Sequence, residues 1–148
     1  MKSKTTAAWL AFLGGPLGLH RFYLFGFGDP MAWLLPVPTL VGAYGVLRMA
    51  FLGQNDGLSW LLIPVLGFTI AGCCLMAIVF GLKTRAEWNT RFNPAADPED
   101  AAGGTHWGTI AVIVVSLMFG ASALLAGIAI SFQSFFDDQT RQGREISQ

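Results

Sequence analysis

The chain has 148 residues, no formal net charge at pH 7, 53% hydrophobic residues and 12% charged residues. That charged fraction is about half of the fraction in ordinary soluble domains. The neutral balance and the scattered basic residues argue against a nucleic-acid partner. No charged residue lies between Asp56 and Lys83 or between Asp100 and Asp137. A soluble protein of this size could not bury two such stretches, so the composition predicts an all-α integral membrane protein.

Four segments are predicted to cross the membrane, because roughly 20 apolar residues span the hydrocarbon layer. A turn signal at Asp29-Pro30 separates the first two segments. The four predicted spans cover residues 5–25, 31–52, 58–82 and 107–132.

The four predicted spans form two helical hairpins, residues 1–57 and residues 58–136. The second hairpin contains a loop at residues 83–106, and residues 137–148 form a polar tail that we expect to be disordered. With four spans both termini lie on one side of the membrane. That side carries five Lys and Arg residues against four on the other, so the positive-inside rule gives almost no preference. We favour the cytoplasm for both termini.

The segment after the third span has two alternative interpretations. Lys83 and Glu87, and then Glu87 and Arg91, are four residues apart, a spacing that stabilises a helix. Residues 83–92 therefore either extend the third helix along the membrane surface or form its frayed end. Residues 93–105, rich in proline, glycine and acidic side chains, are predicted to be a mobile loop.

Small residues recur at four-residue spacing in the last two predicted spans. This spacing places them on one helix face and lets helix backbones approach closely. The faces serve either to pack these two spans together or to form a homo-oligomer. The pairs are Gly67/Ala71, Ala77/Gly81, Ser116/Gly120, Ala123/Gly127 and Gly127/Ser131.

The sequence offers few candidates for chemistry. Cys73 and Cys74 are adjacent in an apolar run, which favours packing residues over a metal or redox site. His20 and His106 are the only histidines and make a weak metal site without nearby carboxylates. We therefore predict no catalytic residue, no cofactor and no metal.

The run from Gly18 to Leu24 places a histidine and an arginine at the end of an apolar stretch, where a charge is costly. Arg21 either anchors the helix end by reaching to the headgroups or docks an anionic lipid or a partner's carboxylate. The candidate lipid or partner contacts are His20, Arg21, Tyr23 and Arg48.

The same run resembles the TM-two domain family, whose members contain a two-helix membrane module. The resemblance rests on Lys4-Thr5-Thr6-Ala7-Ala8, Leu13-Gly14-Gly15 and Gly18-Leu19-His20-Arg21-Phe22-Tyr23-Leu24, with a looser likeness at Gly42, Gly45 and Asp56-Gly57. It covers about residues 2–57 and implies a membrane hairpin without a known enzymatic activity. Arg48 stands where the family usually has an aspartate.

By elimination, the sequence predicts a non-catalytic membrane component that packs with itself or binds a membrane protein partner, in contact with membrane lipids. The alternative is an oligomeric pore or a small transporter. Neither of the last two spans holds an ionisable residue of the kind that coupled transporters carry near the midplane. The predicted location is a bacterial inner membrane.

Overall fold

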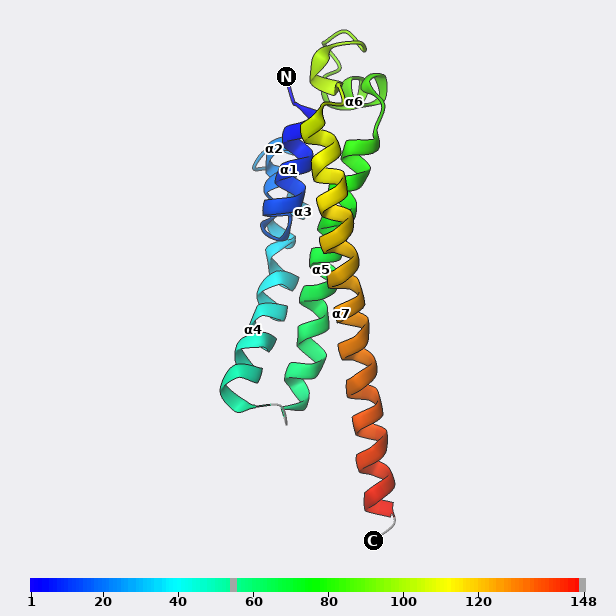
Figure 1. The fold of residues 1–148 in the computed structure, drawn as a ribbon. Helices are drawn as coiled ribbons and strands as arrows, with labels where there is room; N and C mark the ends of the chain where they lie inside the picture. The colour runs from blue at the N-terminus through cyan, green and yellow to red at the C-terminus, as the bar shows by residue number, and fades with distance from the viewer. Residues whose placement is uncertain (54–55, 147–148) are drawn as a thin grey trace.

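The computed structural model describes residues 1–53 and 56–146, and every regular element in this part of the chain is a helix. This confirms the predicted all-α class. Figure 1 shows long helices lying side by side under a small cap of short segments. The helices are α1 (Lys4–Gly14), η1 (Gly15–Leu17), α2 (Leu19–Phe25), α3 (Pro30–Leu34), α4 (Pro36–Leu52), α5 (Gly57–Leu82), α6 (Arg85–Phe92), η2 (Ala101–Gly103) and α7 (Trp107–Ile146).

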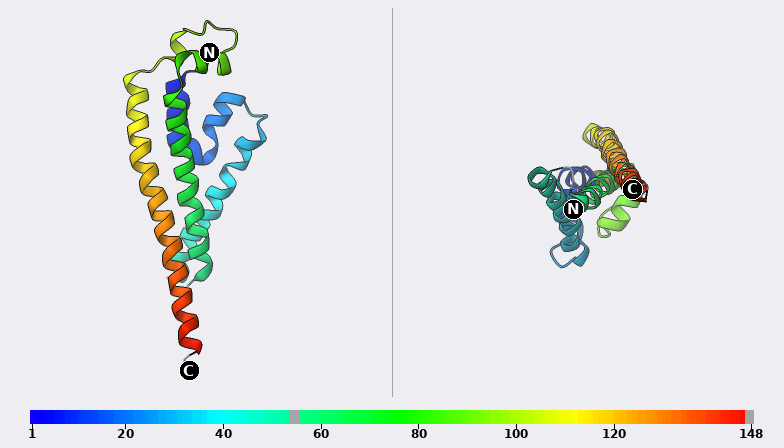
Figure 2. Two further views of the ribbon diagram at one scale, coloured as in Figure 1. Left: turned by 90° about the vertical axis from the view of Figure 1, so that its right-hand side faces the viewer. Right: turned by 90° about the horizontal axis from the view of Figure 1, so that it is seen from below.

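The first predicted span, residues 5–25, is not one helix. The helices α1 and α2 run in opposite directions and form a short hairpin that returns to the end where the chain begins (Figure 2). Two hydrogen bonds fix this arrangement at its open end. The Lys2 Nζ donates to the Leu24 carbonyl at 2.5 Å, and the Ser3 amide donates to the Tyr23 hydroxyl at 2.8 Å.

The hairpin turns where glycine and proline interrupt the apolar sequence. Gly18 has a φ of 76°, in the left-handed region that glycine adopts without strain. A Cβ atom at Gly18 would also collide with the Ala32 carbonyl oxygen. At the same turn, the Thr39 hydroxyl donates to the Pro16 carbonyl at 2.7 Å and joins the tip to α4.

Three segments among the described residues are long and apolar enough to cross a membrane. They are Pro30–Leu52, Gly57–Leu82 and Ala101–Asp137. These agree with the second, third and fourth predicted spans. The arrangement of four spans in two hairpins is not confirmed, because α1, η1 and α2 form a short hairpin and not one long helix.

The helix α5 lies at the centre of the molecule and packs against α1, α4 and α7. Glycines bring α4 close to it: a Cβ atom at Gly42 would lie 2.5 Å from the Leu66 amide nitrogen, and one at Gly45 would lie 2.6 Å from the Leu62 Cβ. Viewed from below in Figure 2, α4 and α7 lie on different sides of α5. The lower half of the bundle is therefore built from these three helices.

The helix α7 contains 40 residues and is about 60 Å long at 1.5 Å per residue. It continues well past the other helices, as Figure 1 shows. The prediction of a disordered tail at residues 137–148 was wrong as far as Ile146, while residues 147 and 148 lie outside the described part. The Thr140 hydroxyl donates to the Phe136 carbonyl within this continuous helix.

The segment after α5 is neither a frayed end nor a simple extension of that helix. Helix α6 starts anew at Thr84, whose hydroxyl accepts from the Glu87 amide, while the Glu87 carboxylate accepts from the Thr84 amide. This reciprocal capping box accounts for the fresh start. Trp88 and Phe92 of α6 are buried on the cluster that holds the upper part of the bundle together.

The two termini lie at opposite ends of the molecule (Figure 1). Four spans would place the termini at the same end of the molecule, so this arrangement of the ends differs from the expected one. The cause is the α1–α2 hairpin, which reverses the direction of every helix that follows. Arg21, expected at the end of the first span far from the N-terminus, lies instead at the end where the chain begins.

Candidate functional site

The connection from α2 to α3 is closed by an ion pair. The Arg21 Nε lies 2.6 Å from the Asp29 Oδ2, and the Arg21 guanidinium lies 5.1 Å from the centre of the Phe25 ring. Asp29 also caps α3, since its carboxylate accepts from the Met31 amide. The Arg21 hydrogen bond lowers the pKa of the Asp29 carboxyl. Arg21 is thus engaged within the chain.

The connection from α4 to α5 at the other end of the molecule has the same design. The Arg48 Nε and Nη2 each lie 2.8 Å from a different oxygen of Asp56, a bidentate pair. Asp56 caps α5 by accepting from the Ser59 amide, and the Ser59 hydroxyl also donates to it. The Arg48 hydrogen bonds, with those of Ser59, lower the pKa of the Asp56 carboxyl.

The glycine that ends the preceding helix has the same backbone conformation in both connections. Gly26 has φ 81° and ψ −179°, and Gly53 has φ 82° and ψ −178°. Each glycine amide donates to the carbonyl four residues earlier, at the end of the preceding helix. In both cases the arginine precedes the glycine by five residues and the aspartate follows it by three. The sequence analysis named both arginines but missed their aspartate partners, although the repeated Arg–Gly–Asp spacing is present in the sequence.

The other two candidate contacts, His20 and Tyr23, are also held inside the molecule. The His20 ring is only 2% exposed and lies 5.9 Å from the Phe80 ring, centre to centre. The Tyr23 hydroxyl accepts from the Ser3 amide. The four predicted contacts are not gathered into one site.

A polar cap joins the N-terminus to the segment between α5 and α7. Asn93 clamps the Lys2 backbone: its Oδ1 accepts from the Lys2 amide at 2.7 Å, and its Nδ2 donates to the Lys2 carbonyl at 3.0 Å. The Trp88 indole donates to the same carbonyl at 2.8 Å. These contacts show that residues 93–105, predicted to be a mobile loop, begin in a buried and hydrogen-bonded position.

Lys4 is the most deeply enclosed cation of the cap. It is fully buried, and its ammonium donates to the Lys83 carbonyl at 2.8 Å and to the Thr105 hydroxyl at 2.7 Å. Lys83 follows Leu82, the last residue of α5, so the Lys4 ammonium lies near the C-terminal end of that helix, where the helix dipole places partial negative charge. Burial, assisted by Arg85, lowers the pKa of Lys4. Sequence reasoning did not single out this residue.

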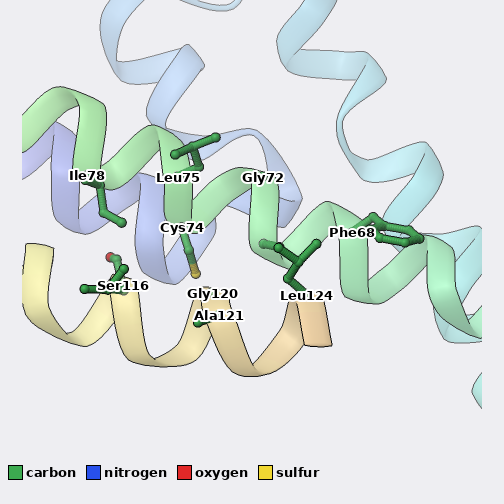
Figure 3. Close-up of a pocket in the computed structure, with 11 residues that line it drawn as sticks. Phe68, Gly72, Cys74, Leu75, Ile78, Ser116, Gly120, Ala121 and Leu124 are labelled. Atoms are coloured by element: carbon green, nitrogen blue, oxygen red, sulfur yellow. The ribbon is translucent and has the colours of Figure 1, made fainter. Parts of the chain in front are cut away.

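An open groove with a volume of about 340 Å³ lies between α5 and α7 (Figure 3). Small residues from both helices line it together with larger aliphatic side chains and one hydroxyl, that of Ser116. The α5 residues are Phe68, Ala71, Gly72, Cys74, Leu75 and Ile78, and the α7 residues are Ser116, Leu117, Gly120, Ala121 and Leu124. The groove lies within two of the three candidate spans.

The four-residue small faces of the sequence pack α5 against α7. A Cβ atom at Gly67 would lie 3.0 Å from the Ala123 carbonyl oxygen, and one at Gly120 would lie 2.7 Å from the Cys74 Cβ. Cys73 and Cys74 are buried free cysteines, and Gly15 packs against Cys73. Among the residues that the structure describes, no three His, Cys, Asp or Glu side chains gather in a way that could hold a metal ion.

No family model, no curated protein and no solved structure matches this chain. The fold of the described residues places the protein in a general class, that of all-helical proteins with three candidate membrane-spanning helices. Membership in the TM-two family stays a prediction that rests on the N-terminal residues.

Proposed function

We propose that this protein is a non-catalytic membrane component that binds a partner within the bilayer. The observation that carries this proposal is the use of the polar groups. Arg21 and Arg48 are each paired with an aspartate, and Lys4 is enclosed by neutral acceptors. The groove between α5 and α7, by contrast, is lined almost entirely by apolar side chains and lies within two of the candidate spans.

The structure supports a topology of three spans and one hairpin that enters the membrane and returns. In this proposal the cap and the N-terminus lie on one side, and the C-terminal end of α7 lies on the other. Buried backbone at the hairpin tip fits this placement, since irregular backbone at membrane depth must be covered by protein or face water. Gly15 and Gly18 at the tip are both buried.

The distribution of basic residues supports an orientation with the cap in the cytoplasm. Six of the nine Lys and Arg residues lie at the cap end, and three lie at the other end. The positive-inside rule places the richer side in the cytoplasm. The cap-end residues are Lys2, Lys4, Arg21, Lys83, Arg85 and Arg91, and the others are Arg48, Arg141 and Arg144.

Purification in native membrane discs tests the partner-binding proposal. We expect the tagged protein to recover the same lipid or protein in repeated preparations, identified by mass spectrometry. A tagged membrane protein of similar size and unrelated sequence serves as the control. Recovery of the protein with no component enriched over that control, in discs that retain native lipid, would contradict the proposal.

An oligomeric pore or small transporter is the second candidate, and the α1–α2 hairpin is the observation that favours it. Returning hairpins can line an aqueous path in membrane proteins. Here the tip is packed on its neighbours, because the Thr39 hydroxyl holds the Pro16 carbonyl and Gly18 lies against Ala32. We therefore expect liposomes with the purified protein to release ions and small solutes no faster than empty liposomes. Release above that level would favour the pore.

A further inference from the structure

Ser116 is the one polar side chain among the residues that line the groove, apart from the Cys74 thiol. Its residue is fully buried, and its hydroxyl has no hydrogen-bond partner in the described part of the chain. Figure 3 shows this hydroxyl pointing from α7 toward α5. An unpaired buried hydroxyl costs free energy unless a partner reaches it.

Other hydroxyls in the long helices solve this problem locally. Those of Thr69, Ser122 and Ser131 each donate to the carbonyl four residues earlier, at 2.7–2.9 Å. Ser116 makes no such bond. A helical serine has this local partner within reach, so its absence at the groove points to an acceptor supplied from outside the chain.

The depth of Ser116 restricts what that acceptor is. Trp107 begins α7 at the cap end, and Ser116 is nine residues further, about 13 Å along the helix. Half of the hydrocarbon layer is about 15 Å, so Ser116 lies near the midplane. The ester groups of ordinary phospholipids stay at the interface with their headgroups and do not reach this depth.

The size of the groove restricts the occupant further. A helix with its side chains is about 10–12 Å wide, too wide for a groove of about 340 Å³. The volume lies at the lower end of the range for sites that bind small molecules, which are mostly apolar with a few placed polar groups. An elongated hydrocarbon bearing one oxygen fits both the lining and the single hydroxyl.

We infer that the groove between α5 and α7 binds a neutral lipid whose hydrocarbon chain carries one carbonyl or hydroxyl oxygen, which bonds to Ser116. The inference rests on the proposed function, because it names what a binding protein of the membrane holds at this site. A lipid without a charged headgroup can place its oxygen near the midplane. Gly72, which lines the groove, leaves room for its chain, since no heavy atom lies within 4 Å of a Cβ built at this glycine.

Photolabelling of the full-length protein in membrane discs tests this inference. The probe is a long-chain ketone with a photoreactive diazirine beside the carbonyl, and the matched probe is the same chain without the carbonyl. We expect the ketone to label groove residues of α5 and α7, located by mass spectrometry, about three- to tenfold more than the matched probe. That ratio is the effect of one net hydrogen bond.

Four variants sharpen the test. Ser116→Ala should lower ketone labelling to the level of the matched probe, and Ala121→Phe should fill the groove and abolish labelling by both. Ala126→Phe is the control: it adds the same ring to an exposed alanine about 140° around α7 from Ala121 and should leave labelling unchanged. Ala121→Leu, a smaller change, covers the case in which the phenylalanine variant does not fold.

Equal labelling of the wild type by the two probes would overturn the inference, as would unchanged labelling of Ala121→Leu or Ser116→Ala. The purification can also recover a protein partner equally with the wild type and with Ala121→Leu while the groove is not labelled. That result would support the proposed partner-binding function and refute the lipid site. If the purification recovers no partner and the groove is not labelled, both the proposed function and the lipid site are refuted.

Discussion

Among single residues, Lys4 carries the most constrained polar contacts of the cap. Replacing it by methionine keeps the length of the side chain but removes the donor to the Lys83 carbonyl. An unpaired buried carbonyl costs about 1–3 kcal/mol, so we expect Lys4→Met to lose stability of that order. Lys83→Met is the control, because only the backbone oxygen of Lys83 serves the contact. Thermal unfolding followed by circular dichroism measures both.

The lowered pKa of Lys4 gives this residue a pH signature. Its folded pKa lies below the unfolded value of 10.5, so the unfolded state binds more protons between the two. The stability of the wild type relative to Lys4→Met should therefore rise as the pH is raised from 7 toward 10.5. A difference that stays constant or falls over this range would show that the buried ammonium is not desolvated.

The two arginine–aspartate pairs predict sensitivity to acid. The pKa values of Asp29 and Asp56 are lowered, so the stability that they contribute is present above their usual range and is lost as the pH falls through the lowered values. Asp56→Asn should lower the melting temperature at pH 7 and flatten its decline in acid. Asp97→Asn, in an exposed loop position, should change neither.

At the scale of helices, close contact between α4 and α5 depends on glycine. A methyl group at Gly42 of α4 would meet the backbone of Leu66 in α5. A methyl group at Gly72, which also lies in α5, would meet nothing within 4 Å. We expect Gly42→Ala to cost about 1–3 kcal/mol through overpacking. Gly72→Ala should be neutral or slightly stabilising, since alanine favours a helix. Equal melting temperatures of the two variants would contradict the packing described for α4.

Helix existence was largely predictable from the sequence, because long uncharged runs identify spans by length and composition. The segments Gly57–Leu82 and Pro30–Leu52 were located to within one residue. The break in the first segment was not predicted. The direction of the chain after Gly18 is decided by the left-handed backbone of that residue and by its close approach to Ala32, and both depend on the tertiary structure.

The candidate residues also divide into those that the sequence identifies and those that only the tertiary structure reveals. Arg21 and Arg48 were recognised because a charge beside hydrocarbon is conspicuous, while their partners Asp29 and Asp56 lie eight residues away across a turn. Ser116 was noted only as one of many small residues. Its missing hydrogen bond is visible only when both helices are in place.

For the whole molecule, the α1–α2 hairpin is the feature with the widest consequences. It changes the number of candidate spans to three among the described residues and puts the termini at opposite ends. It also turns a nearly even division of basic residues into six at the cap end and three at the other. The conformation of this single segment thus alters the expected orientation of the entire chain.

The side of the membrane on which each terminus lies tests this account most directly. Cys73 and Cys74 are buried, so a single cysteine can be added after Met1 or after Gln148 and probed in intact cells with a reagent that does not cross the membrane. The account predicts that the C-terminal cysteine reacts from outside, while the N-terminal one reacts only after the membrane is opened. Reaction of both cysteines from the same side would contradict the returning hairpin and restore the four-span arrangement.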